Sequence, residues 1–337
     1  MSTLSFRKKI SILGAGSWGT ALAVTFAYRH DVLMWGFDPE QVKKIETERR
    51  NKKFLPVVGL PDSVHVTGDM EESIRDADVV LFAVPSHVLR KVVKQAAGFT
   101  TRKQYLVTVV KGIERGTHQR MSEVLADEVK NHKGIIALSG PTHAEEVAKK
   151  APTAIVAASR NRRAAKALQW MFITPWFRVY SSADIIGVEV GAALKNVIAI
   201  AAGICDGLNF GDNSKAALIT RGLAEIKRLG LKMGAREETF SGLSGMGDLI
   251  ATCMSKYSRN RKVGYLLGHG RSLDDILNEM TQVAEGVTNT RSALEIAALH
   301  KVELPIAQAV GAILFKGMPA ADISQLLMSR SAKDEFY

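Results

Sequence analysis

The chain has 337 residues, of which 46% are hydrophobic, 23% charged and 7% aromatic. This composition is ordinary for a globular protein with a large core, and it excludes disordered and collagen-like architectures. At about 100–200 residues per domain, the length predicts two domains. The only cysteines are Cys205 and Cys253. They are too few for a disulfide scaffold or a four-cysteine zinc module, so we expect a reducing compartment.

The 45 lysines and arginines exceed the 34 acidic residues and give a net charge of +11. Such an excess fits a nucleic-acid surface, a membrane surface or small anionic ligands. The basic residues occur in short groups with acids interleaved and no aromatic-rich RNA motif beside them, so we expect no nucleic-acid partner. The groups are Arg7–Lys9, Arg49–Arg50, Lys52–Lys53, Lys149–Lys150 and Arg162–Arg163.

The uncharged stretch Ile10–Tyr28 follows a basic cluster, which is the outline of a signal peptide. It contains Gly14, Gly16 and Gly19, and each glycine costs a helix interior about 1 kcal/mol, so a signal helix is disfavoured. Later apolar runs such as Val197–Cys205 are far shorter than the ~20 residues that span a bilayer. We therefore expect a cytoplasmic protein without integral membrane association.

Short apolar runs alternate with segments of helical apolar spacing through the first half of the chain. This alternation predicts an α/β fold with a Rossmann-like, mostly parallel, doubly wound sheet. The expected strands are Ile10–Leu13, Val32–Trp35, Val64–Thr67, Val79–Val84, Leu106–Val109, Ile135–Leu138 and Thr153–Ala157. The expected helices are Trp18–Tyr28, Pro39–Arg50, His87–Ala97, Gln119–Asn131 and His143–Lys149.

After about Ser182 the strand signal fades, and alanine- and leucine-rich helical segments take over. We expect the sheet domain to span residues 1–182 and an all-helical C-terminal domain to span residues 183–337. No proline-rich linker separates them, so they should pack closely with the active cleft between them. The helical segments are Val190–Ala202, Lys215–Leu229, Arg236–Phe240, Asp274–Glu279, Thr288–Lys301, Ile306–Phe315 and Ala320–Met328.

The run Gly14-Ala15-Gly16-Ser17-Trp18-Gly19 has the form G-x-G-x-x-G, directly after an expected strand and at the start of a helix. The first glycine permits a tight turn, the second lets a pyrophosphate approach the backbone, and the third allows close helix–strand packing. The helix N-terminus supplies donors and partial positive charge. Because its position agrees, the motif predicts dinucleotide binding rather than a plain glycine-rich turn.

Asp38 lies at the end of the second expected strand, 19 residues beyond the last glycine of this motif. An acid there can accept hydrogen bonds from the adenosine ribose, which would favour NAD. It can equally cap the helix that begins at Pro39. The sequence leaves both interpretations open.

Two other segments follow strands, at the edge where open parallel sheets bind ligands. Lys111, in Val110-Lys111-Gly112, is a candidate to contact an anion or a carbonyl, although a surface lysine is the plainer interpretation. Ser139-Gly140-Pro141-Thr142 offers backbone N–H groups before a helix, although it would also serve as a turn alone.

Lys195 interrupts Gly191–Ile200, a helical segment that is otherwise almost wholly apolar. Desolvation there would lower the pKa of the lysine toward the range where it can donate and accept protons. The alternative is a lysine at a helix edge whose head group reaches solvent. Asp248, in the turn Gly245-Met246-Gly247-Asp248-Leu249, is suited to hold this lysine or a substrate hydroxyl, or else caps a helix.

Ser258-Arg259-Asn260-Arg261 groups donors that suit a phosphate at the start of a helix, with a solvated basic loop as the alternative. Glu285 is a further acid in a turn, and its type alone indicates no function. The chain lacks H-E-x-x-H, C-x-x-C, Walker A and G-x-S-x-G motifs. Its histidines are too scattered to indicate a metal, so no metal site is expected.

Seven ordered motifs together resemble the bacterial NAD(P)-dependent sn-glycerol-3-phosphate dehydrogenases, from about residue 9 to residue 330. Any one motif could occur by chance, whereas the ordered set is specific. The motifs are Gly14–Gly19, Val84-Pro85-Ser86-His87, Lys111-Gly112, Ser139–Thr142, Leu194-Lys195-Asn196-Val197, Gly245–Leu249 and Ser258–Arg261.

The resemblance implies hydride transfer between NAD or NADP and the pair dihydroxyacetone phosphate and glycerol 3-phosphate, which would supply phospholipid synthesis. Lys195 would be the general acid and base, and Asp248 would hold it together with a substrate hydroxyl. The implied substrate contacts are Lys111, Gly140, Thr142, Lys195, Asp248, Ser258, Arg259 and Asn260. With the glycine loop and the end of the second strand included, the candidate cofactor contacts are Gly14, Gly16, Ser17, Trp18, Gly19, Phe37, Asp38, Lys111, Ala144, Arg259, Val283 and Glu285.

The chain departs from the resemblance at Gly36-Phe37-Asp38, where relatives often have His or Arg before the acid. Phe37 cannot donate to a 2′-phosphate, which puts NADP in question, although Arg49 or Arg50 could compensate. The resemblance also implies a homodimer.

Two other classes compete with this interpretation. A related two-domain dehydrogenase for a β-hydroxyacid or sugar acid would share the glycine motif and a helix lysine, but it would need a carboxylate site in place of Ser258–Asn260. A non-catalytic redox-sensing regulator would use its positive charge on DNA and would lack the pair of Lys195 and Asp248.

Overall fold

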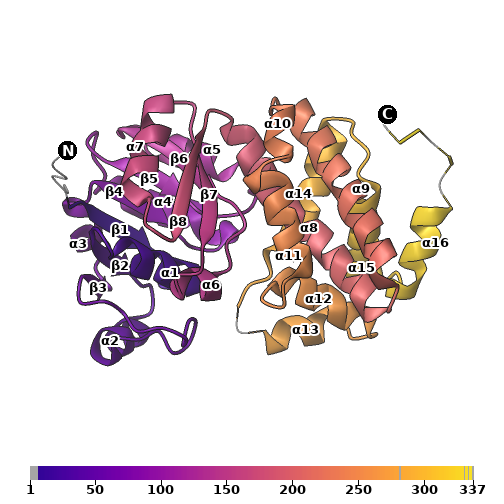
Figure 1. Ribbon diagram of the computed structural model, residues 1–337, viewed down its shortest axis with the longest axis horizontal. Helices are drawn as coiled ribbons and strands as arrows, with labels where there is room; N and C mark the ends of the chain where they lie inside the picture. The colour runs from indigo at the N-terminus through magenta and orange to yellow at the C-terminus, as the bar shows by residue number, and fades with distance from the viewer. Residues whose placement is uncertain (1–6, 281, 330, 333, 336–337) are drawn as a thin grey trace.

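The computed structural model describes residues 7–280, 282–329, 331–332 and 334–335. Within these residues the chain forms two halves that lie side by side, a sheet half and a helical half (Figure 1). The last strand ends at Ser182 and the first long helix of the helical half begins at Ile185. This arrangement agrees with the α/β fold and the helical C-terminal region expected from the sequence.

Eight strands within the described residues form one sheet, in the order β3-β2-β1-β4-β5-β6-β7-β8. All neighbouring strands run parallel except β6 and β7. The order reverses between β1 and β4, the place where doubly wound sheets bind ligands. The strands are β1 (Lys9–Leu13), β2 (Asp31–Trp35), β3 (Val64–Thr67), β4 (Val79–Phe82), β5 (Tyr105–Thr108), β6 (Gly134–Ser139), β7 (Thr153–Ala158) and β8 (Phe177–Ser182).

The edge strand β8 and the reversal at β7 are features that the sequence analysis did not predict. In β8, Phe177 and Val179 are buried while Arg178 and Tyr180 are exposed. Only two apolar side chains in this strand therefore face the core, too few to produce a clear strand signal. The direction of β7 follows from how the chain returns to the sheet, which apolar patterning does not encode.

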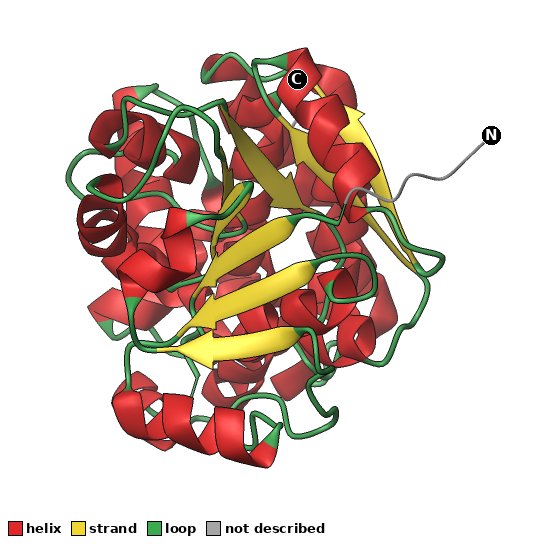
Figure 2. Cartoon of the chain, turned by 90° about the vertical axis from the view of Figure 1, so that its left-hand side faces the viewer, coloured by secondary structure: helices red, strands yellow, loops and turns green. Residues whose placement is uncertain are grey.

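Helices cover both faces of the sheet (Figure 2). α1, α6 and α7 pack on one face through residues such as Leu22, Val147 and Leu168, and α4 and α5 pack on the other through Val93 and Leu125. The expectations did not include α3 and α7. The helices are α1 (Ser17–Phe26), α2 (Pro39–Glu48), α3 (Met70–Arg75), α4 (Leu89–Ala97), α5 (Met121–Glu128), α6 (Ala144–Ala148) and α7 (Arg162–Phe172).

The long helix α8 (Ile185–Gly207) runs through the core of the helical half. It is the one helix in the described part of the chain that is long and apolar enough to span a membrane, and 94% of its apolar window is buried inside the fold. A Cβ on Gly264 would lie 1.9 Å from the Ile200 carbonyl oxygen, so only glycine permits this approach to α8. The close crossing holds the middle of α12 directly against α8.

The other helices of this half pack around α8. The segment expected as one helix at Ala320–Met328 divides into a 3₁₀ turn and α16, and α11 was not expected. They are α9 (Gly211–Lys232), α10 (Glu237–Phe240), α11 (Asp248–Met254), α12 (Arg259–Gly268), α13 (Leu273–Glu279), α14 (Glu285–Leu299), α15 (Pro305–Lys316) and α16 (Ile323–Met328).

Candidate active site

A cleft of about 630 Å³ lies between the two halves, at the carboxyl ends of β1, β2, β4, β5 and β6. This volume is within the range of about 300–1,000 Å³ that small-molecule sites occupy. Both halves contribute to its wall, as the sequence predicted. All the candidate residues line the cleft except Gly19 and Gly140, which lie behind the wall.

The glycine loop has the geometry that a pyrophosphate needs. Gly14 has a φ of +130°, and a Cβ on Gly19 would lie 2.0 Å from the Gly14 carbonyl oxygen, so both positions require glycine. Nothing lies within 4 Å of a Cβ built on Gly16, which leaves its backbone open to the cleft. No side chain in the described part of the chain caps the N-terminus of α1. Its first N–H groups are therefore available to an anion, and the loop fits a dinucleotide.

Asp38 caps α2, and Phe37 beside it is exposed at the cleft wall. The Asp38 carboxylate accepts hydrogen bonds from the backbone N–H groups of Glu40 and Gln41 at 3.0 and 3.3 Å. Both of these bonds reach Oδ1, and Asp38 also lines the cleft. Capping and ribose binding are therefore compatible roles for this side chain.

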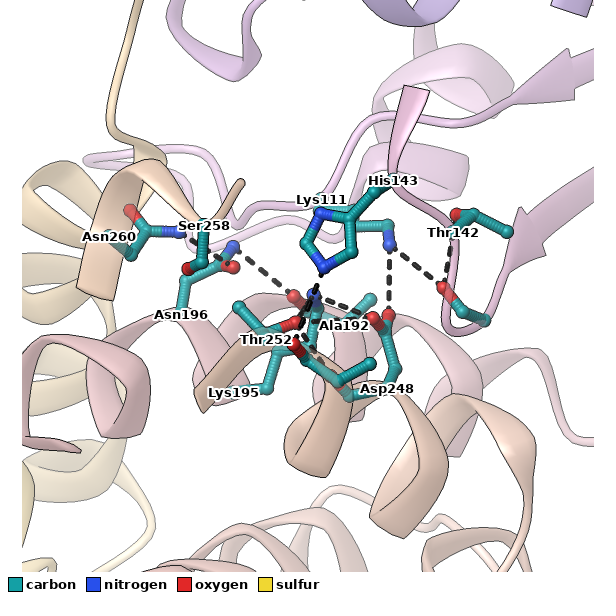
Figure 3. Close-up of polar contacts among 12 residues, drawn as sticks. Lys111, Thr142, His143, Ala192, Lys195, Asn196, Asp248, Thr252, Ser258 and Asn260 are labelled. Carbon is teal, nitrogen blue, oxygen red and sulfur yellow. Dashed lines mark hydrogen bonds and ion pairs between the residues drawn. The ribbon is translucent and has the colours of Figure 1, made fainter. Parts of the chain in front are cut away.

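Lys195, Asp248 and Lys111 form one ion cluster on the cleft wall (Figure 3). The Nζ atom of Lys195 lies 2.8 Å from Oδ1 of Asp248, and the Nζ atom of Lys111 lies 2.8 Å from Oδ2. The side chains of Lys195 and Asp248 are only 5% and 2% exposed. A single buried carboxylate is therefore shared by two ammonium groups, and the expected contact between Asp248 and Lys195 is present.

Burial and the neighbouring charges together set the protonation of this cluster. Desolvation is the largest influence on Lys195, and together with the charge of Lys111 it lowers the pKa to about 8 against the opposing charge of Asp248. Burial alone would raise the pKa of Asp248, but the two ammonium groups outweigh burial and hold that pKa below its usual value. The site thus combines an ionised carboxylate with a lysine that can lose and regain a proton near neutral pH.

Thr252 is a site residue that the sequence analysis missed. Its hydroxyl accepts a hydrogen bond from Nζ of Lys195 at 2.6 Å and donates to the Asp248 carbonyl oxygen at 2.6 Å. An ammonium has three donors. Among the described residues, Asp248 and Thr252 take two of them, which leaves the third N–H available to a ligand. The only available signal was its position one helical turn after Asp248.

Asn289 on α14 is a second residue that sequence reasoning missed. Its amide nitrogen donates to the backbone carbonyls of Lys111 and Ala193, both at 3.1 Å. Its side-chain oxygen is buried without a partner in the described part of the chain. Asn289 therefore ties the Lys111 turn to α8, and an asparagine within a helical segment gives no sequence signal for such a role.

Lys111 also holds the turn that follows β6. Its Nζ atom donates to the Gly140 carbonyl oxygen at 3.1 Å, and the Thr142 hydroxyl donates to the same oxygen at 3.1 Å. A Cβ on Gly140 would lie 3.0 Å from Cα of Ile155, so this position packs against the sheet. Gly140 thus contributes its backbone, while Thr142 and Ala144 face the cleft.

Ser258 and Asn260 begin α12 and are partly engaged within the protein. The Ser258 hydroxyl accepts a hydrogen bond from the Arg261 N–H at 3.2 Å and so caps the helix. The Asn260 side chain donates to the Asn196 side-chain oxygen at 2.9 Å and accepts from the Gly286 N–H at 2.8 Å. Both still line the cleft, where their remaining donor capacity is available to a ligand.

Arg259 and Glu285 connect the helical half to the sheet half across the cleft. Arg259 donates to the Val283 carbonyl oxygen at 3.0 Å and to the Ser17 hydroxyl at 3.3 Å. The Glu285 carboxylate accepts from the Ser86 N–H at 2.9 Å and from its hydroxyl at 2.5 Å. Glu285, whose residue type indicated nothing, thus contacts the turn that follows β4.

Comparison with known proteins agrees with this geometry. Two family models, described as the N-terminus and the C-terminus of NAD-dependent glycerol-3-phosphate dehydrogenase, match residues 9–165 and 184–325. The chain is 47% identical over 332 residues to a glycerol-3-phosphate dehydrogenase (NAD(P)+) of Enterococcus faecalis, which covers 98% of each chain. It is 48% identical over 331 residues to that of Bacillus subtilis, which covers 97% of this chain and 96% of the relative.

A solved structure points to the same family. The glycerol-3-phosphate dehydrogenase of Coxiella burnetii superimposes with a TM-score of 0.93 at 36% identity, covering 96% of this chain and all of that one. These matches confirm the resemblance seen in the sequence and favour it over the two competing classes. The chain therefore belongs to the NAD-dependent glycerol-3-phosphate dehydrogenase family.

Proposed function

We propose that this protein interconverts dihydroxyacetone phosphate and sn-glycerol 3-phosphate with NAD(P)H, using Lys195 as general acid and base. Family membership supports the reaction and its small phosphorylated substrate. The observation that carries the role of the lysine is the buried cluster of Lys195, Asp248 and Lys111 in a cleft that also contains the dinucleotide loop.

In the reduction, the Lys195 ammonium donates a proton to the substrate carbonyl oxygen, which becomes a hydroxyl. The nicotinamide cofactor, when bound, supplies the hydride in this direction and accepts it in the reverse. The neutral Lys195 amine then regains a proton from solvent. In the oxidation the neutral amine takes the hydroxyl proton, and a pKa of about 8 suits both directions.

Some of the other proposed contacts position Lys195 and the reacting part of the substrate, and the rest bind the substrate phosphate. Asp248 and Thr252 fix the direction of the Lys195 ammonium. Lys111 and Thr142 form the side of the pocket next to the reacting carbon, and the Gly140 carbonyl oxygen accepts a hydrogen bond from each of them. Arg259, with Ser258 and Asn260, binds the substrate phosphate, because a planar guanidinium matches phosphate oxygens in pairs.

The cofactor contacts follow the length of the cleft. Gly14 and Gly19 shape the loop, and the backbone around Gly16 binds the pyrophosphate. Asp38 accepts from the adenosine ribose, with Phe37 beside it. The remaining proposed contacts are Ser17, Trp18, Lys111, Ala144, Arg259, Val283 and Glu285.

We further propose a homodimer whose subunits divide into domains at residues 1–182 and 183–337. The exposed apolar side chains Met246, Ile250 and Met254 support a dimer, since they repeat at helical spacing on one face. The end of β8 at Ser182 supports the domain boundary. A cytoplasmic location and a role in supplying phospholipid synthesis are proposals that rest on family membership alone.

The deciding experiment compares the unmodified enzyme with Lys195→Ala. Absorbance loss of NADH and NADPH on addition of dihydroxyacetone phosphate measures turnover, and fluorescence of the bound cofactor measures its affinity. Loss of a general acid lowers kcat by about a thousandfold, while cofactor affinity stays unchanged. Lys232→Ala, at an exposed position on α9, is the matched control. Unchanged turnover in Lys195→Ala would refute the mechanism.

A further inference from the structure

One segment of the chain has seven basic residues and no acidic residue, so it contributes seven of the eleven units of net positive charge. Elsewhere the basic groups are interleaved with acids, so residues 147–183 are an exception to the expected pattern. The segment includes the end of α6, β7, α7 and β8. Its basic residues are Lys149, Lys150, Arg160, Arg162, Arg163, Lys166 and Arg178.

These seven side chains form no ion pair with any residue that the structure describes. All of them are exposed, and none pairs with a carboxylate among the residues that the structure describes. Instead, Lys150 lies over the ring of Trp176 at 4.9 Å and Arg178 over the ring of Tyr180 at 5.6 Å. Their charge is therefore directed to solvent or to a partner and does not stabilise a neighbouring element.

Helix α7 presents part of this charge as a stripe. Leu168 and Phe172 face the core, while Arg163, Lys166 and Trp170 recur at the spacing of one helix face and are exposed. The side chain of Trp170 is 73% exposed. Figure 1 shows α7 on the sheet half, away from the helical half. The stripe thus ends in a large apolar ring that no described residue covers.

The surface continues past the C-terminal end of α7. The Arg29 guanidinium donates to the Ile173 carbonyl oxygen at 3.2 Å. Tyr28, which is 55% exposed, packs edge-on against Trp176 with ring centroids 4.9 Å apart. Because Lys150 lies over the same Trp176 ring, these contacts join the ends of α1, α6 and α7 into one basic and aromatic surface. Its members are Tyr28, Arg29, Lys150, Arg162, Arg163, Lys166, Trp170 and Trp176.

We propose that this basic and aromatic surface docks the protein reversibly on an anionic phospholipid bilayer. Lysine and arginine clusters are attracted to anionic headgroups, and Trp and Tyr rings are favoured at the level of the headgroups. A second copy of the same surface would be repelled, because it carries the same charge. A single-stranded nucleic acid is bound in a groove that tracks its backbone, whereas this stripe is the outer face of a helix.

The surface is separate from the proposed chemistry. None of its members lines the cleft. Substitutions in it therefore leave the basal turnover of soluble substrate unchanged, and bilayer binding can be measured whether or not the proposed reaction is correct. A failure of bilayer binding would therefore leave the proposed reaction untouched, and a failure of the proposed reaction would leave bilayer binding untouched.

The test is co-sedimentation of the full chain with vesicles of mixed phosphatidylglycerol and phosphatidylcholine at about 0.1 M salt. The unmodified protein sediments with these vesicles, is released as salt rises, and ignores vesicles of phosphatidylcholine alone. The variant Arg162→Glu/Arg163→Glu/Lys166→Glu binds about a hundredfold more weakly, since three attractive charges are reversed. The control Lys103→Glu/Lys232→Glu/Lys316→Glu makes the same change in net charge at dispersed exposed positions and retains binding.

Trp170 provides a second measurement. Insertion of its ring at the headgroup level shifts the protein's tryptophan emission to the blue when vesicles are added, and Trp170→Ala loses most of this shift. Equal loss of binding in both triple variants would overturn the proposal, because only net charge would then matter. Absence of sedimentation at low salt would also overturn it, as would tighter binding to an oligonucleotide than to the vesicles.

Discussion

The protonation of Lys195 predicts how the rate depends on pH. Reduction requires the charged ammonium, and the charged fraction falls as the pH rises through about 8. We expect kcat/KM for dihydroxyacetone phosphate to be level below this pH and to fall above it. The oxidation of glycerol 3-phosphate requires the neutral amine and should rise over the same interval. Rate measurements in both directions, at saturating cofactor, test the two limbs.

Lys111→Met tests whether the second ammonium tunes the first. The charge of Lys111 lowers the pKa of Lys195, so its removal should move the falling limb of the reduction to higher pH. The substitution also weakens substrate binding, which reduces the height of the profile without moving its limb. A limb that stays in place would show that Lys111 does not act on Lys195 through its charge.

Phe37 predicts a preference for NADH, and Phe37→Arg should weaken that preference. The ring is 80% exposed beside Asp38 and offers no donor to a 2′-phosphate. An arginine adds a charge-assisted hydrogen bond, which should raise the ratio of kcat/KM for NADPH to that for NADH by about tenfold or more. Phe37→Ala is the control and should leave the ratio low. An equal effect of both variants would mean that the ring merely blocks the site.

Sequence reasoning located the charged members of the site but not the residues that orient them. Lys195 stood out because a lysine in an apolar helix is rare, and its contact with Asp248 is present at 2.8 Å. Asn289 gave no signal, and Thr252 gave only its position one turn after Asp248, because threonine and asparagine are common in helices and their role depends on which segments meet in space. Hydrogen bonds between distant segments have no local signature.

At the scale of elements, a buried ion pair joins α5 to the helix that carries Lys195. The Glu189 carboxylate on α8 accepts from the N–H and the hydroxyl of Ser122 at 2.7 and 2.6 Å and also pairs with Arg120. Burial raises the pKa of Glu189, and the charge of Arg120 opposes this. Both side chains are 4% exposed, so neither can exchange its partner for water.

Removal of one partner of this pair should therefore be costly. Glu189→Ala leaves Arg120 buried without its main counter-charge, and we expect a loss of about 3–5 kcal/mol in the free energy of unfolding, measured by urea denaturation. The double variant Arg120→Met/Glu189→Leu should lose less, since it buries no unpaired charge. Glu71→Ala, which breaks an exposed pair with Arg75, is the control and should leave the unfolding midpoint unchanged.

Apolar patterning predicted most elements of the fold but not the edge of the sheet. The central strands are buried on both faces, so Val79–Phe82 gives a continuous apolar run. β8 is buried on one face only, and α7 before it has three exposed cations that obscure its apolar side. The features that were missed therefore lie where burial is partial and a short pattern is ambiguous.

At the scale of the whole molecule, the cleft is formed by two halves that are also joined by polar contacts around it. Asn289 joins the Lys111 turn to α8, and Glu285 contacts Ser86 across the opening. Arg259 reaches the glycine loop through Ser17. A ligand that fills the cleft therefore touches both halves, and its binding energy adds to the stability of the whole chain.

Addition of NADH should raise the Tm of the protein, and Arg259→Ala should reduce this rise. A ligand at a hundred times its Kd stabilises the folded state by about 2.7 kcal/mol, which amounts to several degrees in a chain of this size. Arg259 is exposed at the cleft, so its removal changes the Tm of the free protein little but weakens the cofactor and with it the shift. Arg271→Ala removes a half-exposed arginine of the same half that does not line the cleft, and it should keep the full shift. If Arg259→Ala kept the full shift as well, the cofactor would be held by the sheet half alone, and the contact between Arg259 and the glycine loop would have no part in binding it.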